Sequence, residues 1–268
     1  MPKTYNKLVG CGCSFSDYCG NPTLTFNAYA AKQLELPYLD LTAGASSNLR
    51  WTRILTSEIR KGNITKDDLL VLQFTNPSRT EFVTDLPRNS SSWSFPTWNA
   101  VTNPIFDARV HKSGKPIDEK YNDKYWLLRH MPQSGNWADN KIIKEWHSLY
   151  MKYFYCEEYV KELFLNQLFS LQQILKEFNV IYIYTGYINH EIKLEPFMKM
   201  LNNNTCVIEA MSMVNKETTP DLKYCLDAPF DCAHINQAGH EVIGRTIVDL
   251  VELNSFSTET PPNLAIIK

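Results

Sequence analysis

The chain has 268 residues, of which 44% are apolar and 21% charged, and its formal net charge is −2. This is the composition of a globular protein, and the near-neutral charge gives no support for nucleic acid as a partner. No apolar run approaches the roughly 18 residues that cross a bilayer, and the polar residues 1–7 lack the apolar stretch of a signal peptide. We therefore expect a cytoplasmic protein with no membrane partner.

The first third of the chain alternates short apolar runs with segments of helical spacing. Five strands are expected, at Leu8–Gly12, Tyr38–Leu41, Leu69–Phe74, Val180–Tyr184 and Thr205–Ile208. Helices are expected at Phe26–Leu34, Asn48–Arg60, Lys141–Phe178 with a break near Tyr155, and Gln237–Leu253. This order predicts a doubly wound, flavodoxin-like α/β fold, with a mostly parallel five-stranded sheet and helices on both faces. Such sheets bind ligands beyond the carboxyl ends of their strands.

One long segment interrupts this alternation. Residues 85–140 are rich in Pro, Ser, Asn and Asp and contain four of the six tryptophans, which is typical of a functional loop or an insertion. The tryptophans suit two interpretations equally: stacking on the sugar of a carbohydrate ester, or forming the core of a small irregular subdomain. We expect a single domain over residues 1–253 with this insertion, followed by a surface tail over 254–268.

The seven cysteines are scattered along the chain, and their odd number favours reduced thiols over a disulfide framework. Cys11, Cys13 and Cys19 lie close enough in sequence to suggest a metal site. However, there is no CxxC pair, and no nearby histidine completes a tetrahedral set. We therefore expect buried thiols and no metal ion.

Two short motifs carry the groups that nucleophilic catalysis needs. Ser14 follows the first expected strand at a glycine-bearing turn, where its hydroxyl is exposed at the ligand edge and its N–H can face the same cleft. Asp231 and His234 precede the last helix at a spacing that lets the carboxylate orient the imidazole, which can then take a proton from serine. The plainer interpretations are a turn in which Ser14 or Ser16 caps a helix, and a solvated helix entry at the histidine.

Other polar residues extend or rival this set. Gly44 follows the second strand, where its backbone allows close approach to a ligand, and Asn76 follows the third strand with two amide donors. Each of the two is equally explained as a turn residue. Asp227 is a rival for the acid, and His240 is expected to pack within the last helix.

In this order, the four blocks around Ser14, Gly44, Asn76 and the Asp231/His234 pair resemble the SGNH/GDSL hydrolase family. The resemblance implies that Ser14 is the nucleophile, His234 the general base and then acid, and Asp231 the orienting acid. It further implies an oxyanion hole made by the N–H groups of Ser14 and Gly44 and the side chain of Asn76. It implies no metal and no cofactor.

The chain departs from the family pattern at three positions. Cys13 replaces the usual aspartate before the nucleophile, Phe74 replaces the usual glycine two residues before Asn76, and Pro77 follows that asparagine. We expect the bulky Phe74 to narrow the cleft or to shift the loop.

The resemblance implies a serine esterase or acetylhydrolase that forms an acyl-serine and removes a short acyl group, such as an O-acetyl group on a carbohydrate. The expected substrate is a small-molecule or glycan ester, and a transferase with the same intermediate is a variant. The alternative is a weak or inactive hydrolase-fold protein that serves as a structural or glycan-binding component. Proteins resembling this chain occur in bacterial viruses, so a viral particle is a second expected location, and assembly into an oligomer or larger structure stays open.

Overall fold

The protein is represented by a computed structural model, which describes part of the chain. The described residues are 4–13, 16, 25–42, 46–75, 77, 80–83, 125–128, 145, 148–150, 152–184, 200–209, 237–253, 256 and 263–266.

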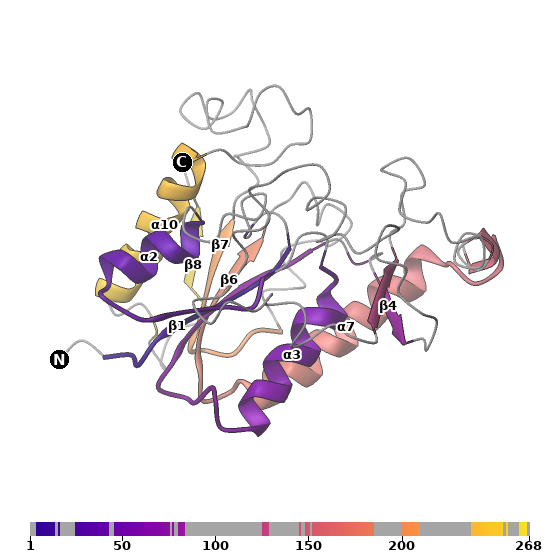
Figure 1. Ribbon diagram of the computed structural model, residues 1–268, viewed down its shortest axis with the longest axis horizontal. Coiled ribbons are helices and arrows are strands. Elements are labelled where there is room, and N and C mark those ends of the chain that lie inside the picture. The colour runs from indigo at the N-terminus through magenta and orange to yellow at the C-terminus, as the bar shows by residue number, and fades with distance from the viewer. Residues whose placement is uncertain are drawn as a thin grey trace, which may run out of the picture.

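A six-stranded sheet, in the order β2-β1-β3-β6-β7-β8, forms the centre of the fold (Figure 1). Every neighbouring pair in it is parallel. The strands are β1 Leu8–Cys11, β2 Tyr38–Asp40, β3 Leu69–Gln73, β6 Asn179–Tyr184, β7 Thr205–Glu209 and β8 Asn263–Ile266. The first five of these confirm the predicted strands, and their order confirms the predicted doubly wound α/β class.

Two features differ from the prediction. β8 adds a sixth strand to the predicted five and lies within residues 254–268, which were expected to form only a surface tail. Four residues show too little periodicity to reveal a strand, and the partner β7 is remote in sequence. A second, antiparallel sheet joins β4, Thr80–Val83, to β5, Tyr125–Leu128, so the segment expected to be irregular contributes a strand.

In the described part of the chain, four helices cover the two faces of the central sheet. They are α2 Phe26–Gln33, α3 Asn48–Arg60, α7 Glu157–Ile174 and α10 Gln237–Glu252. Helices α2 and α10 lie side by side on one face, while α3 and α7 cover the other (Figure 1). All four confirm predicted helices, and α7 begins just after the predicted break because Cys156 has an extended backbone, with φ −136°.

Local sequence signals explain where α2 and α3 begin and end. The Thr25 side chain accepts a hydrogen bond from the Ala28 N–H, and Ser47 does the same for Arg50, so each helix has an N-terminal cap. Helix α3 ends at Arg60, and Gly62, which follows the cap residue Lys61, has φ 74°, a conformation that glycine adopts at little cost. The two N-terminal caps therefore define where each preceding loop ends and its helix begins.

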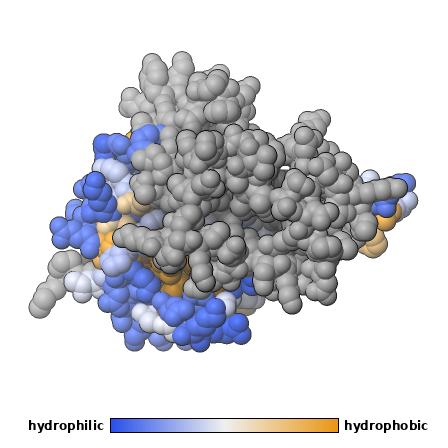
Figure 2. Space-filling model, in the orientation of Figure 1, coloured by the Kyte–Doolittle hydropathy of each residue, from blue (hydrophilic) through white to orange (hydrophobic). Residues whose placement is uncertain are grey.

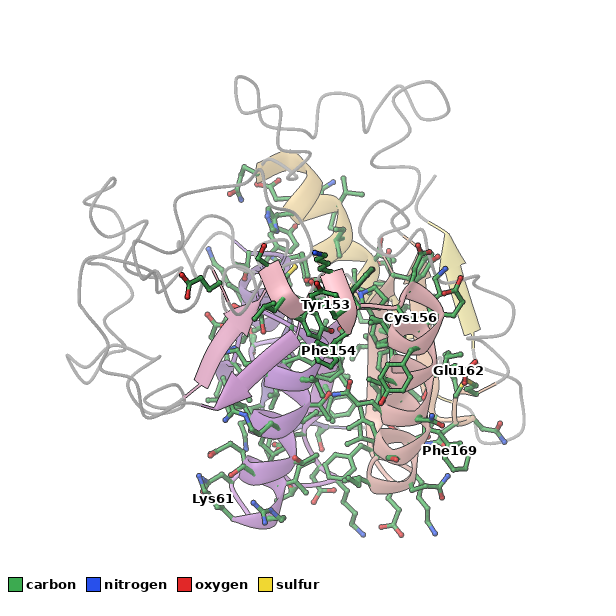
Figure 3. The ribbon with its side chains drawn as sticks, turned by 90° about the vertical axis from the view of Figure 1, so that its right-hand side faces the viewer. Lys61, Tyr153, Phe154, Cys156, Glu162 and Phe169 are labelled. Atoms are coloured by element: carbon green, nitrogen blue, oxygen red, sulfur yellow. The ribbon has the colours of Figure 1, made fainter. Side chains whose placement is uncertain are left out.

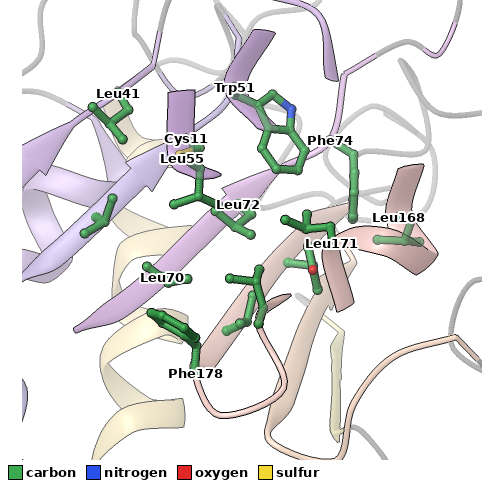
Figure 4. Close-up of a cluster of buried hydrophobic side chains, with 14 of the residues drawn as sticks. Cys11, Leu41, Trp51, Leu55, Leu70, Leu72, Phe74, Leu168, Leu171 and Phe178 are labelled. Atoms are coloured by element: carbon green, nitrogen blue, oxygen red, sulfur yellow. The ribbon is translucent and has the colours of Figure 1, made fainter. Parts of the chain in front are cut away.

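The core forms two layers because neighbouring residues of a strand point to opposite faces of the sheet. In β3, Leu69 and Val71 pack beneath α2 and α10, whereas Leu70 and Leu72 pack beneath α3 and α7. Figure 4 shows the second layer, in which Trp51 of α3 lies over the end of β3. Burial on both faces explains why the strands read as continuous apolar runs in the sequence.

The outer surface is mixed in character. Most of the described surface visible in Figure 2 is hydrophilic, but α7 and the residues before it expose several large apolar side chains. Figure 3 labels three of them, Tyr153, Phe154 and Phe169. Among the described helices, none has both the length and the apolar character needed to span a bilayer.

Candidate active site at the carboxyl edge of the sheet

The strand order creates one preferred place for a ligand. From β1 the chain passes to β2 on one side, and it then returns to β3 on the other side of β1. In parallel sheets a crevice opens at such a switch point, beyond the carboxyl ends of the two central strands. In register, Cys11 of β1 pairs with Leu72 of β3, so the residues that follow these two strands emerge together.

All five predicted site residues lie outside the described residues: Ser14, Gly44, Asn76, Asp231 and His234. The rival acid Asp227 does so as well. The triad and the oxyanion hole therefore stay predictions. For Ser14, Gly44 and Asn76, the structure does describe residues close by on both sides in the sequence.

The Gln73 side chain, at the end of β3, holds the turn that contains Ser14. Its Oε1 accepts hydrogen bonds from the backbone N–H of Cys13 at 2.9 Å and from the Ser16 hydroxyl at 3.3 Å. The Cys13 thiol also donates to it at 3.2 Å. Gln73 is fully buried, and its Nε2 donates to the Phe74 carbonyl. One carboxamide thus ties the turn after β1 to the end of β3 on both sides of the expected nucleophile.

Two further hydrogen bonds, both to the Cys13 carbonyl, close the turn. The Ser16 N–H donates to the Cys13 carbonyl at 3.0 Å, and the Ser16 hydroxyl donates to the same oxygen at 3.1 Å. Ser16 is 0% exposed. Its hydroxyl proton is thus used within the turn, and Ser14 stays the predicted nucleophile of this motif.

Gly12 is required by the closeness of this packing. A Cβ atom at position 12 would lie 2.2 Å from Ser16 Oγ and 2.8 Å from Gln73 Oε1. Both distances are far inside van der Waals contact. Glycine at this position therefore lets Gln73 and Ser16 meet directly over the backbone.

The end of β3 is held by Asn48, the first residue of α3. Its Nδ2 donates to the Thr75 carbonyl at 2.9 Å, and its Oδ1 accepts from the Thr75 N–H at 3.0 Å. The strand ladder ends one residue earlier, where the Phe74 N–H donates to the Ile183 carbonyl. At Thr75, the last described residue before Asn76, the Asn48 side chain therefore makes the hydrogen bonds that a neighbouring strand would otherwise make.

Phe74 does not occupy the cleft in the way that the sequence suggested. Its side chain is 1% exposed and stacks on Tyr182, with ring centroids 4.8 Å apart. Edge contacts to Phe164 and Trp51 complete an aromatic cluster beneath α3 and α7. The expected narrowing of the cleft is thus wrong, because the ring fills the core instead.

Asp40 stabilises the chain as it leaves β2 toward Gly44. Its Oδ1 accepts from the Thr42 N–H at 2.9 Å, from the Thr42 hydroxyl at 2.7 Å and from the Tyr38 hydroxyl at 3.1 Å. Burial, and then the Asp40 charge, raise the pKa of Tyr38. The phenol therefore stays a neutral donor to this carboxylate.

His240 packs on the face of the sheet that α2 and α10 cover. Its Nδ1 accepts a hydrogen bond from the Phe26 N–H at 3.0 Å, and its ring stacks on the Phe26 ring at 5.5 Å. With 1% exposure it packs between α10 and α2, as the sequence suggested.

Two of the clustered cysteines are separated by the sheet. Cys11 belongs to the core layer beneath α3 and α7, while Cys13 belongs to the layer beneath α2 and α10. Burial raises the pKa of the Cys11 thiol well above its ordinary value, so the thiolate that binds metals is disfavoured. Within the described residues, no group of three His, Cys, Asp or Glu side chains is arranged to hold a metal ion.

Comparisons with known proteins give structural matches alone. No family model matches the sequence, and no curated protein matches it. A candidate lipolytic protein of the G-D-S-L family from Desulfitobacterium hafniense DCB-2 is similar over 91% of this chain and 99% of its own, at 12% identity and a TM-score of 0.45. A candidate GDSL-like lipase from Parabacteroides merdae ATCC 43184 is similar over 93% and 97%, at 10% identity and a TM-score of 0.43. LAE5, an alpha/beta hydrolase enzyme from the metagenome of Lake Arreo, Spain, is similar over 96% and 97%, at 12% identity and a TM-score of 0.40.

Sequence reasoning missed the roles of Gln73 and Asn48. A signal for Gln73 was present, because an amide at the end of the apolar run Leu69–Phe74 must find partners when it is buried. Asn48 had no comparable signal, since an asparagine that begins a helix most often serves that helix.

Proposed function

We propose that the chain is a serine hydrolase that cleaves a short-chain carboxylic ester through an acyl-serine intermediate. Ser14 is the nucleophile, His234 the general base and then acid, and Asp231 the orienting carboxylate. The observation that carries the proposal is the Gln73 clamp, which binds both Cys13 and Ser16 and so fixes the two ends of the Ser14 turn at the switch point. A turn held so firmly at the ligand edge suits a nucleophile that must meet a substrate in one geometry.

The reaction follows from these roles. The Ser14 hydroxyl attacks the ester carbonyl carbon while His234 takes its proton, and the carbonyl oxygen becomes an oxyanion. Collapse of this intermediate breaks the bond to the alcohol, which leaves with the proton from His234. Water then attacks the acyl-serine by the same route and releases the acid and Ser14.

The oxyanion hole is assigned by considering which donors are already used. The Cys13 N–H donates to Gln73 and points into the fold, so it is not a donor to the substrate. The next N–H along the chain belongs to Ser14, and we assign it to the oxyanion together with the Gly44 N–H and the Asn76 side chain. Loss of the Asn76 amide should lower kcat by about a hundredfold to a thousandfold.

Hydrolysis of p-nitrophenyl acetate and of an acetylated sugar tests the proposal. The parent protein should hydrolyse at least one of them, while Ser14→Ala and His234→Ala should lose the activity and remain folded. Ser170→Ala is a matched control, because Ser170 lies on the exposed side of α7 and donates only to the Asn166 carbonyl of its own helix. A folded parent protein that cleaves neither ester would support a structural or glycan-binding role instead.

A further inference from the structure

Asn48 begins α3, yet its side chain serves a different part of the chain. It is 3% exposed and pairs with both the N–H and the carbonyl of Thr75. These bonds join α3 to the end of β3 across 27 positions of sequence. An amide that satisfies both backbone groups of one residue fixes that residue in position and in orientation.

Thr75 matters because it directly precedes Asn76. The carbonyl of Thr75 and the N–H of Asn76 belong to the same planar peptide unit. When Asn48 Nδ2 holds the Thr75 oxygen, it fixes the plane through which the chain enters Asn76. The direction in which the backbone reaches the proposed oxyanion donor is therefore set from α3.

Asn48 is itself firmly anchored. Its Oδ1 also accepts from the Trp51 indole N–H at 3.1 Å, and its carbonyl accepts from Gln167 Nε2 of α7 at 3.1 Å. The preceding residue, Ser47, caps α3 through the Arg50 N–H. Two helices and a large buried ring thus hold this asparagine, and its side chain has little freedom to follow a displaced loop.

We infer that Asn48 is a positioning residue of the oxyanion hole, which it serves by orienting the Thr75–Asn76 peptide. The inference rests on the proposed function and does not require Asn48 to touch the substrate. Asn48 would also link the two loops that contain the proposed oxyanion donors Gly44 and Asn76, because the loop with Gly44 leads directly into α3.

The first test separates kcat from KM for p-nitrophenyl acetate. Asn48→Ala should lower kcat by about tenfold to a hundredfold with KM little changed, because a displaced donor is felt mainly in the transition state. Asn48→Asp is the isosteric variant, since it keeps the acceptor for the Thr75 and Trp51 N–H groups but sets a carboxylate oxygen against the Thr75 carbonyl in place of the donor. It should also lower kcat, even if Asn48→Ala folds poorly.

A double-mutant cycle with Asn76→Ala tests whether Asn48 acts through that donor. When the Asn76 amide is already absent, the loss caused by the Asn48 substitution should shrink to less than about threefold. A residue that acts independently of Asn76 would lower kcat by the same factor in both backgrounds. Equal factors would therefore overturn the inference.

Asn179→Ala is the matched control. Asn179 is another buried asparagine, whose Nδ2 donates to the Tyr5 hydroxyl at 2.6 Å, but it lies at the start of β6 and thus at the opposite edge of the sheet. Its loss should reduce stability and leave kcat unchanged.

A parent protein without esterase activity would overturn the proposed function and the inference together. An active parent with unchanged kcat in both Asn48 variants would overturn the inference alone.

Discussion

His240 Nδ1 accepts a hydrogen bond from the Phe26 backbone N–H at 3.0 Å, which joins residues 214 positions apart. The bond ties the first half of α10 to the first turn of α2, and the two helices lie side by side (Figure 1). Helix α10 begins three residues after His234, while α2 follows the segment that starts with the Ser14 turn. The contact therefore brings an early helix and a late helix of the chain together on one face of the sheet.

Replacing His240 by phenylalanine should destabilise the fold. The ring stacking on Phe26 is retained, but the buried Phe26 N–H loses its acceptor, at a cost of about 1–3 kcal/mol. Urea unfolding measures this change in free energy. Glu241→Gln is the control, because its exposed ion pair with Arg245 contributes little. An unfolding free energy for His240→Phe equal to that of the parent would show that the bond is unimportant.

Substitution of Gly12 by alanine should damage the Ser14 turn. The new Cβ would meet Ser16 Oγ at 2.2 Å, so the turn or the Gln73 side chain must move. We expect esterase activity and the thermal midpoint both to fall. Adding Ser16→Gly should restore part of the stability by removing the nearest atom.

Gly62→Ala provides the comparison for that variant. A Cβ at position 62 would meet nothing within 4 Å, and its cost comes only from φ +74°. It should lower the thermal midpoint and leave kcat unchanged. If Gly12→Ala behaves in the same way as Gly62→Ala, the close packing at the turn has no bearing on activity.

The described cysteines should differ sharply in reactivity. Cys156 is exposed, with its thiol 3.3 Å from a Glu158 carboxylate oxygen, whereas Cys11, Cys13 and Cys206 are buried. Burial raises the pKa of Cys206 to about 12, so its reactive thiolate is scarce at neutral pH. Iodoacetamide followed by peptide mapping should find Cys156 modified first, and rapid labelling of Cys206 in the folded protein would contradict its burial.

Stability should fall at alkaline pH because of buried phenols. Burial raises the pKa of Tyr182 and of Tyr38 in the folded protein above the ordinary value of 10.0. The free energy of folding that these two protonated phenols contribute is fully present below about pH 10. It is lost as the pH rises above about 10, because the phenols then lose their protons in the unfolded chain but keep them in the folded protein. Urea unfolding between about pH 8 and about pH 11 measures the loss. In Tyr182→Phe the loss should be smaller, and an equally steep fall would exclude Tyr182 as a source.

Much of the fold could be predicted because its signals are local. Apolar runs such as Leu69–Phe74 mark strands buried on both faces, and Thr25 and Ser47 mark helix starts. The strand β8 escaped prediction because a short edge strand is defined by its partner more than by its own residues. The strand β5 was also not predicted, because its partner β4 is separated from it by a long intervening segment.

The candidate site was less predictable than the fold. The order of its motifs predicts which loops meet at the carboxyl edge of the sheet, but it does not reveal which side chains hold those loops. Gln73 and Asn48 act across 60 and 27 positions of sequence, and both appear in the sequence as ordinary strand or helix residues. The side chain of Phe74 shows the same limit, because its direction depends on the aromatic rings that surround it.

The central claim is that Ser14 is an activated nucleophile, and covalent labelling tests it most directly. A fluorophosphonate probe applied to the folded protein should form one adduct, which peptide mapping assigns to Ser14. Labelling should vanish in Ser14→Ala and slow strongly in His234→Ala, because the imidazole takes the proton from the attacking hydroxyl. An adduct on Ser16 or elsewhere, or labelling of Ser14→Ala as strong as that of the parent protein, would contradict the account.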